Sequence, residues 1–435
     1  MDDIKTVNPG RRAAFVSLCK MGAGKYTNLE VGTMLSRMQI SEEDRGLYTA
    51  LVYGVTERLI TLDYMIRTLS KRPFSVLDGD VLCALRLGLY QLAFMDRIPP
   101  HAAVSQSVAL APEKGRGFVN ALLRTFVRGG CKVPMPEGNE VQALSVRYSV
   151  PVPLCDAFTE WYGNDAAEKI FAAFLEKEAV ALRVNTLRQG VQDVAACLDG
   201  TVSNVCDACV KVSSFHGILS GIEAGDWFVQ DTASALCARL VGACPGETIA
   251  DVCAAPGGKS FAMAMEMENQ GKIYAFDLHS NKLSLIRRGG EKLGISILET
   301  EERDARKPRE SLVGRVDRVL CDAPCSGLGV IGKKPDIKYK DMDTILRLPA
   351  VQYDVLVGAS AYVRPGGTLV YSTCTLNPAE NAGVTDRFLA KHPDFVPAPF
   401  SFAGAEQSNL TLFPHIHGTD GFYICRMQRK GGQRG

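Results

Sequence analysis

Two cysteines stand in short motifs whose residue types suit covalent catalysis. Cys325 closes the sequence Asp-Ala-Pro-Cys and Cys374 closes the sequence Ser-Thr-Cys, and we expect each motif to follow a strand. The thiolate form of cysteine is a strong nucleophile, but a free thiol titrates at about pH 8.5, so an active site must favour ionisation. With a Gly-rich turn upstream at residues 251–259, the pair predicts covalent chemistry beside a bound cofactor.

The Gly-rich turn runs from Asp251 to Lys259, between an expected strand and an expected helix. Its glycines allow the backbone to approach a ligand closely, and a helix N-terminus favours negative groups. A P-loop requires glycine where this chain has Cys253, and the dinucleotide fingerprint Gly-x-Gly-x-x-Gly is absent. S-adenosylmethionine carries no phosphate and is the ligand that remains. The expected cofactor contacts in the turn are Cys253, Ala254, Ala255, Pro256, Gly257, Gly258 and Lys259.

Three aspartates are expected at the ends of successive strands. Asp277 lies 20 residues after Gly257, a spacing at which a carboxylate accepts hydrogen bonds from ribose hydroxyls. Asp304 would meet the adenine amino group, and Asp322 would face the charged end of the cofactor or the substrate ring. A strand-end aspartate also commonly caps the next helix. Because three occur in series beside one turn, we favour ligand binding, since open α/β sheets bind ligands at that edge.

The catalytic part of the chain resembles a known enzyme family at long motifs. These are the turn, Asp322-Ala-Pro-Cys-Ser-Gly-Leu-Gly329 and Tyr371-Ser-Thr-Cys-Thr-Leu-Asn-Pro-Ala-Glu-Asn381, with further matches at 182–185, 229–234 and 414–422. They are similar to the RNA 5-methylcytosine methyltransferases, and among these to the Sun family of ribosomal-RNA cytosine methyltransferases. The N-terminal region resembles the transcription-antitermination factor NusB, most clearly at Gly117-Phe-Val-Asn-Ala-Leu-Leu-Arg124. This fusion implies methylation of a cytosine in 16S rRNA.

The resemblance implies a mechanism for the two cysteines. Carbon 5 of cytosine is a poor nucleophile until a thiolate adds to carbon 6; carbon 5 then takes the methyl group, a base removes its proton, and the thiol is eliminated. The residues themselves do not decide which cysteine attacks. By resemblance, Cys374 is the nucleophile and Cys325 assists proton removal or product release. Asp322 would steady the protonated ring nitrogen, with Lys259 nearby.

Basic residues lie on both sides of the Pro-Cys motif. They are Arg303, Arg306, Lys307, Arg309, Arg315, Arg318, Lys333, Lys334, Lys338 and Lys340. A target base must leave its stack to reach a thiol. The basic residues would either hold the backbone of that RNA strand or form a solvated surface, and the sequence favours neither interpretation.

The sequence around the motifs predicts the elements that position them. Short apolar runs at 249–253, 272–277, 316–321 and 368–372 alternate with helical stretches, which is typical of a mostly parallel, doubly wound sheet. A further strand is expected at 295–299. These elements predict a Rossmann-like α/β methyltransferase domain over residues 226–435. Residues 140–225, with a strand at 181–185, predict a small α/β subdomain similar to an RNA-recognition motif.

Residues 1–130 predict an all-α domain. Apolar residues recur at helical spacing over 44–70, and further helices are expected at 81–95, 101–109 and 117–124. The domain holds 17 Lys and Arg against 12 Asp and Glu, whereas the rest of the chain holds 32 against 36. This basic excess favours RNA binding, although an ordinary basic helical domain fits it equally well. Gly, Pro and polar residues predict a linker at 131–139.

Composition limits the class of protein. No apolar stretch reaches about 20 residues, the length of a membrane span, and the polar residues 1–5 do not match a secretory signal. Fourteen scattered cysteines indicate reduced thiols in a cytoplasmic protein, and Cys206 and Cys209 lack the second pair of a zinc ribbon, so we expect no metal. We expect a monomer whose partner is free or partly assembled 16S rRNA. A tRNA substrate and a non-catalytic RNA-binding factor are the alternatives.

Overall fold

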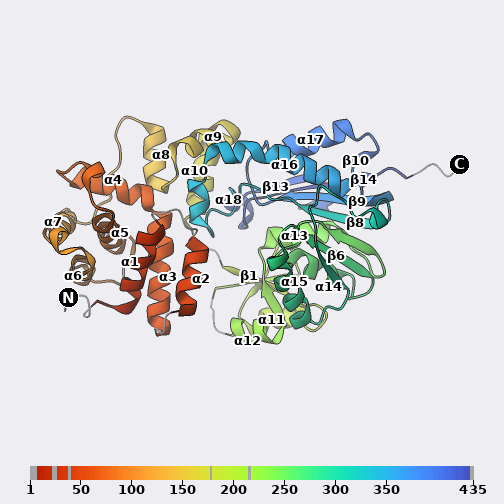
Figure 1. Cartoon of the computed structure of the whole chain (residues 1–435), viewed down its shortest axis with the longest axis horizontal. Helices are drawn as coiled ribbons and strands as arrows, with labels where there is room; N and C mark the ends of the chain where they lie inside the picture. Colours follow the sequence, from red (N-terminus) through yellow and green to blue (C-terminus); the bar gives the residue numbers. More distant parts are fainter. Residues whose placement is uncertain (1–6, 22–26, 38–40, 177–178, 214–216, 432–435) are drawn as a thin grey trace. The chain divides into compact units, whose positions relative to one another are not determined.

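The chain forms two compact units in the computed structural model (Figure 1). The structure describes residues 7–21, 27–37, 41–176, 179–213 and 217–431. Unit 1 consists of residues 1–175 and 331–339, and unit 2 of residues 176–330 and 340–435. Residues 1–5, which we expect not to form a secretory signal, lie outside the described ranges. Within those ranges, no helix has both the length and the apolar character needed to cross a membrane.

Unit 1 is helical, as the spacing of its apolar residues predicts. Its α-helices are α1 (Pro9–Met21), α2 (Thr27–Arg37), α3 (Glu42–Glu57), α4 (Leu59–Leu69), α5 (Gly79–Phe94), α6 (Pro100–Leu110), α7 (Glu113–Arg128), α8 (Glu140–Tyr148), α9 (Val152–Tyr162) and α10 (Asn164–Ala173), with 3-10 turns at Phe74–Val76 and Pro335–Tyr339. The single helix expected over 44–70 is two helices, because Arg58 ends α3 and donates its backbone N–H to the carbonyl of Gly54. Buried Leu51, Val55 and Leu62 belong to the shared core.

Helices α8 to α10 belong to unit 1, although the sequence predicts a separate subdomain from residue 140. The Oγ of Ser149 accepts the backbone N–H of Ile60 at 2.9 Å, and Thr61 Oγ1 donates to the carbonyl of Val146 at 2.6 Å. These bonds join residues more than 80 positions apart in the chain. Local sequence patterns carry no sign of such contacts, which explains why the expected boundary differs from the observed grouping.

Residues 331–339 also pack within unit 1, although in sequence they lie between the two cysteine motifs. Lys338 Nζ donates to the carbonyl of Glu57 at 2.6 Å, and the Tyr339 hydroxyl donates to the carbonyl of Thr56 at 3.0 Å. Both acceptors lie in the last turn of α3, where carbonyl groups lack partners within the helix. A lysine suits this end of a helix because the helix dipole is negative there.

Unit 2 begins with a small antiparallel sheet. Its strands, in spatial order, are β2 (Thr201–Val202), β3 (Cys209–Val212), β1 (Val180–Val184) and β4 (Trp227–Val229), accompanied by α11 (Val191–Cys197) and α12 (Ile218–Ala224). The strand expected at 181–185 corresponds to β1. Leu182 and Val184 alternate along β1 into the core of this sheet.

A second, larger sheet forms the centre of unit 2. Its strands are β5 (Thr248–Asp251), β6 (Lys272–Asp277), β7 (Leu298–Glu302), β8 (Val316–Asp322), β9 (Val363–Thr373), β10 (Phe395–Pro397), β13 (Asn409–Leu412) and β14 (Phe422–Arg429). Strands β7, β6, β5, β8 and β9 are parallel in that order, and β14 adds to β9 antiparallel, with β10 and β13 beside it. Strands β11 (Phe400–Phe402) and β12 (Ala405–Gln407) form a separate hairpin. The expected doubly wound sheet is therefore confirmed, with an antiparallel edge.

Helices cover both faces of the large sheet (Figure 1). One face packs against α13 (Thr232–Leu240), α14 (Gly258–Glu266) and α15 (Ser280–Leu293), and the other against α16 (Met342–Ser360) and α17 (Ala382–Lys391); the short α18 (Pro414–His417) precedes β14. Successive residues such as Leu320 and Cys321 belong to the hydrophobic cores on opposite faces of the sheet. The strand expected at 295–299 begins later, at Leu298. Ile295 instead closes α15, donating its N–H to the carbonyl of Gly290.

Candidate active site

The expected site residues gather at one edge of the large sheet. Asp251, Asp277 and Asp322 end β5, β6 and β8, and Cys374 follows Thr373, the last residue of β9. The strand order reverses at β5, because β6 and β7 lie on one side of it and β8 and β9 on the other. Open α/β sheets bind ligands at the carboxyl edge of such a switch point. The fold therefore brings the Gly-rich turn and both cysteine motifs to the same edge.

The Gly-rich turn joins β5 to α14 with a backbone that requires glycine. Gly257 has φ +114°, a conformation that L-residues rarely adopt, and a Cβ at this position would collide with the ring of Phe261. The carbonyl of Gly257 accepts the N–H of Phe261 in the first turn of α14, which begins at Gly258. The expected helix start near Lys259 is confirmed. The turn therefore places the backbone of Gly257 and Gly258, which carry no side chains of their own, at the N-terminus of α14.

Buried polar atoms beside the turn lack partners among the described residues. Asp251 is 1% exposed; its Oδ2 accepts from the Ser260 hydroxyl at 2.6 Å, while Oδ1 has no hydrogen bond. Burial raises the pKa of Asp251 to about 7. The amide of Gln230 is also buried with neither polar atom bonded, and its Nε2 lies against Gly258. Unpaired buried polar groups are costly, so we expect water or a ligand to complete these atoms beside the turn.

The two other strand-end aspartates have different surroundings. Asp277 accepts the backbone N–H of Ala255 at 3.3 Å and that of His279 at 3.0 Å, so it connects the turn to the start of α15. Asp304 follows β7 by two residues and forms a bidentate pair with Arg306, whose hydrogen bonds lower the pKa of Asp304 to about 2. Both carboxylates retain oxygen lone pairs that a ligand hydroxyl or amino group can use.

The two cysteines of the motifs are in contact. Their Sγ atoms lie 3.2 Å apart, although 49 residues separate them in the chain. The hydrogen bond with Cys374, followed by burial, raises the pKa of Cys325 well above its ordinary value. A raised pKa favours the neutral thiol form of Cys325. This property of Cys325 was not visible in the sequence.

A lysine and an aspartate lie beside the sulfur pair. Lys259 Nζ donates to Asp322 Oδ2 at 2.7 Å, and the Ser372 hydroxyl donates to Asp322 Oδ1 at 2.7 Å. Burial by itself lowers the pKa of Lys259, but the charge and hydrogen bond of Asp322, together with Cys237 and to a lesser degree Cys374, raise it above its ordinary value. Lys259 is therefore a permanent cation beside the cysteines. The sequence analysis expected Lys259 near Asp322, and the structure joins the two by this ion pair.

Glu380 is a site residue that the sequence analysis missed. It is fully buried, and its Oε2 accepts from the backbone N–H of Ser326 and from Gln352 Nε2, both at 2.8 Å, while Asn377 Nδ2 donates to Oε1 at 3.0 Å. Gln352 also donates to the carbonyl of Pro324 at 3.0 Å. The carboxylate thus ties the loop that contains Cys325 to the loop that follows Cys374. The position of Glu380, six residues after Cys374, could have identified it in the sequence as a site residue. Nothing in the sequence around Gln352 of α16 indicates its contact with Glu380.

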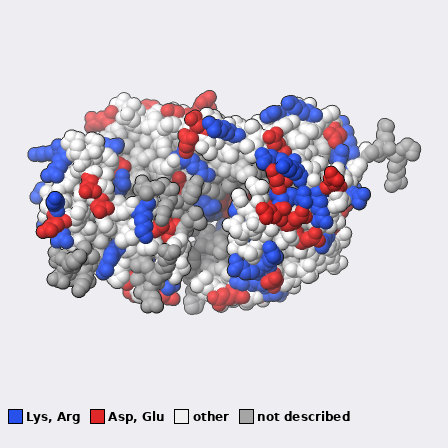
Figure 2. All heavy atoms as spheres, in the orientation of Figure 1, with Lys and Arg blue, Asp and Glu red and all other residues white. Residues whose placement is uncertain are grey.

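Part of the basic stretch around the Pro-Cys motif is paired with carboxylates. Arg303 pairs with Glu301, Arg309 pairs with Glu299 and Glu301, and Arg318 pairs with Glu247. Figure 2 shows positive and negative side chains interspersed over the visible face of unit 2. Lys340 Nζ donates to the carbonyl of Ser326 at 2.8 Å, beside Cys325. Several members of this stretch therefore have structural partners, which favours the second of the two interpretations given above.

Comparison with known proteins agrees with this geometry. The family model described as 16S rRNA methyltransferase RsmB/F matches residues 239–428, and the NusB family model matches residues 8–128. The "Probable ribosomal RNA small subunit methyltransferase B" of Bacillus subtilis (strain 168) is 37% identical over 97% of this chain and 99% of its own. The "Ribosomal RNA small subunit methyltransferase B" of Sodalis glossinidius (strain morsitans) is 32% identical over 91% and 93%. The crystal structure of PH0851 has a TM-score of 0.79 at 26% identity, over 97% of this chain and 98% of that one.

These findings define an S-adenosylmethionine-dependent methyltransferase with an N-terminal NusB-type helical region. The chain belongs to the ribosomal RNA small subunit methyltransferase B family. The resemblance seen in the sequence is thereby confirmed, as are the fold class and the cofactor.

Proposed function

We propose that this enzyme methylates carbon 5 of a cytosine in 16S rRNA through a covalent adduct with Cys374. The observation that carries the proposal is the 3.2 Å contact between the sulfurs of Cys325 and Cys374, beside the cation of Lys259. A nucleophile beside a second, protonated thiol suits a reaction that adds a thiolate and later eliminates it. The names of the relatives support ribosomal RNA as the substrate.

We assign the cofactor to the Gly-rich turn and the aspartates at the strand ends. The residues assigned are Cys253, Ala254, Ala255, Pro256, Gly257, Gly258, Lys259, Asp277, Asp304 and Asp322. The unpaired Oδ1 of Asp251, the unpaired amide of Gln230 and the left-handed backbone that only glycine adopts readily at Gly257 support a polar ligand there. When bound, S-adenosylmethionine supplies an activated methyl group on its sulfonium. Asp277 is the carboxylate best suited to two ribose hydroxyls, because its bonds to Ala255 and His279 hold it rigidly.

In the addition step, the Cys374 thiolate forms a bond to carbon 6 of the cytosine. The electron pair of the carbon 5–carbon 6 double bond forms a double bond between carbon 5 and carbon 4, and the carbon 4–nitrogen 3 pair moves onto nitrogen 3, which takes a proton from solvent. Carbon 5 thereby becomes the nucleophile that can accept the methyl group. Asp322 stabilises the protonated ring nitrogen, and Lys259 holds the Asp322 carboxylate through their 2.7 Å bond. Lys259 also stabilises the thiolate by its positive charge.

In the elimination step, carbon 5 loses its proton and the bond between Cys374 and carbon 6 breaks. Its electron pair leaves with the Cys374 sulfur as the double bond reforms. The neutral thiol of Cys325 passes its proton to the departing sulfur, and the resulting Cys325 thiolate takes up the carbon 5 proton. Cys325 thereby returns to its neutral thiol, whereas Cys374 ends as a thiol. Loss of that proton and of the nitrogen 3 proton to solvent restores the Cys374 thiolate and gives the neutral 5-methylcytosine. The raised pKa of Cys325 supports this role, since the residue must begin as a donor.

Adduct trapping tests the proposal. Cys325→Ala should form the bond to carbon 6 but release the product slowly, so protein purified from cells under denaturing conditions should carry RNA. Sequencing that RNA should identify one cytosine of 16S rRNA, and adding Cys374→Ala should abolish the attachment. The exposed Cys197, on α11, provides a control, because Cys197→Ala should trap nothing. Attachment that survives Cys374→Ala would overturn the assignment of the nucleophile, and attachment to tRNA would overturn the substrate.

A further inference from the structure

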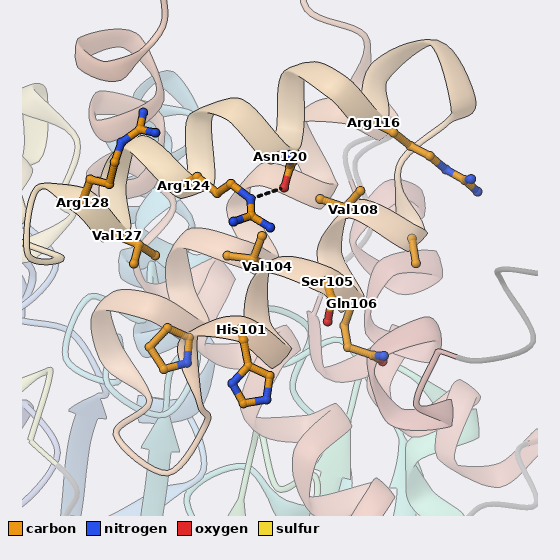
Figure 3. A pocket seen from close by; sticks show the side chains of 12 residues that line it. His101, Val104, Ser105, Gln106, Val108, Arg116, Asn120, Arg124, Val127 and Arg128 are labelled. Atoms are coloured by element: carbon orange, nitrogen blue, oxygen red, sulfur yellow. Dashed lines mark hydrogen bonds between the residues drawn. The ribbon is translucent and has the colours of Figure 1, made fainter.

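A pocket between α6 and α7 of unit 1 has no role in the proposed reaction. Its volume is about 870 Å³, within the range of small-ligand sites. Figure 3 shows Arg124 pointing from α7 over Val104 of α6, with His101 on the opposite side of the pocket. Val104, Val108 and Val127 give the pocket an apolar lining, while histidine and arginine side chains lie around it.

The charged side chains that line this pocket are all positive. Arg116, Arg124 and Arg128 line it from α7, and Asp and Glu are absent from its lining residues. The first and last of these arginines are 12 residues apart, which corresponds to about 18 Å along the helix. A row of positive charges of this length exceeds what one small anion requires and suits several groups of a polyanion.

Two of the arginines have only neutral hydrogen-bond partners among the residues that the structure describes. Arg124 Nε donates to Asn120 Oδ1 at 2.9 Å, and Arg128 donates to the Thr125 hydroxyl at 3.0 Å. In unit 2, by contrast, Arg303 and Arg318 pair with glutamates. Guanidinium groups bound only to neutral acceptors keep their full charge for a phosphate, and arginine binds phosphate bidentately.

We propose that the pocket between α6 and α7 binds a single-stranded segment of the RNA substrate. Arg124 and Arg128 hold successive phosphates, and an unstacked base lies against the valine surface near His101. Single-stranded nucleic acid is recognised in this way, by a positive groove combined with an apolar or aromatic platform for bases. A fully paired helix cannot offer a base to the pocket, so the site selects unpaired RNA. The inference rests on the proposed function, because it takes RNA as the substrate.

Salt-dependent binding tests the inference on the full chain. The probes are a 12-nucleotide single-stranded RNA and a hairpin whose stem contains the same sequence. The test variant is Arg124→Gln with Arg128→Gln, and the matched control is Lys114→Gln with Arg45→Gln. The control residues are exposed, lie on α7 and α3, do not line the pocket and undergo the same change of charge. Glutamine is a good helix former, so both variants should keep the helical circular-dichroism signal of the parent.

The test variant should bind the single strand about tenfold more weakly, and the slope of log affinity against log salt should fall by about 1.4, the loss of two phosphate contacts. The control should match the parent, and the parent should prefer the single strand to the hairpin. Equal losses in both variants would overturn the inference. Full displacement of the RNA by millimolar inorganic phosphate would also overturn it, because that result would indicate a small-anion site. So would a protein that binds an acidic peptide through these arginines but does not bind RNA. The assay requires no methyl transfer, so failure of adduct trapping would not alter its reading.

Discussion

The backbone N–H of Ser326 donates to the buried carboxylate of Glu380 at 2.8 Å, which fixes the loop of Cys325 against the loop that follows Cys374. A second connection supports the first, because the hydroxyls of Ser326 and Thr375 lie 2.7 Å apart. The contact between the two sulfurs therefore depends on residues that contact neither of them. Catalytic groups need such support, since small displacements of reacting atoms lower rates strongly.

The first prediction concerns Glu380→Gln. All three groups that contact this carboxylate are donors, so the amide nitrogen of glutamine must face a donor and leave it unsatisfied. We expect the free energy of unfolding to fall by about 1–3 kcal/mol and kcat to fall at least about tenfold, while KM for S-adenosylmethionine stays within about twofold. Glu406→Gln, at an exposed position of β12, should change none of these. An unchanged kcat in Glu380→Gln would show that the loops hold their geometry without this carboxylate.

The sequence predicted the parts of the site that depend on local patterns. The end of β6 at Asp277 and the helix start after Gly257 follow from short apolar runs and from glycine, which act within a few residues. The contacts of Gln352 with Glu380 depend on how α16 packs on the sheet, and nothing near Gln352 in the chain signals this. The same limit applies to residue 149, whose contact with α4 unites helices that the sequence assigns to different domains.

The second prediction concerns Cys374→Ala. Without the nucleophile, carbon 5 is not activated, and methyl transfer should fall by more than about 10³-fold, as expected when a covalent nucleophile is removed. Binding of S-adenosylmethionine, measured by calorimetry, should change by less than about threefold, because the assigned cofactor contacts are unaltered. Cys244→Ala, at an exposed position, is the control for general effects of removing a thiol. A loss of only a few fold in Cys374→Ala would rule out the covalent mechanism.

The third prediction concerns the glycine at the start of α14. Gly257→Ala forces a Cβ into the ring of Phe261 and places alanine at φ +114°. We expect the free energy of unfolding to fall by about 1–3 kcal/mol. Cofactor affinity should also fall, because strain at a binding turn moves its backbone. Gly46→Ala is the comparison, because that position lies inside α3 with open space around it. It should raise stability by about 0.5–1 kcal/mol and leave cofactor binding alone. Unchanged cofactor affinity in Gly257→Ala would remove this turn from the binding site.

The last prediction concerns the pH dependence of stability that arises from Lys338. Burial lowers the pKa of Lys338 to about 7 from its ordinary value of 10.5, against the smaller opposing effect of Glu57. Between these values the unfolded chain binds more protons than the folded chain, so the free energy of unfolding rises with pH, by up to about 1.4 kcal/mol per pH unit. The cost of burying the charge is therefore largest below pH 7 and decreases as the pH rises through that value. Guanidinium unfolding of the full chain at pH 7, 8 and 9 measures this slope.

Lys338→Met should remove the part of the slope of unfolding free energy against pH that Lys338 contributes. Lys334→Met, at an exposed position of the same segment, should keep the slope of the parent. Comparing the two variants cancels the other groups that titrate in this range, because both lose one lysine. Equal slopes in Lys338→Met and Lys334→Met would mean that Lys338 stays charged in the folded state. Its 2.6 Å bond to the carbonyl of Glu57 would then stabilise the ammonium form strongly enough to offset burial.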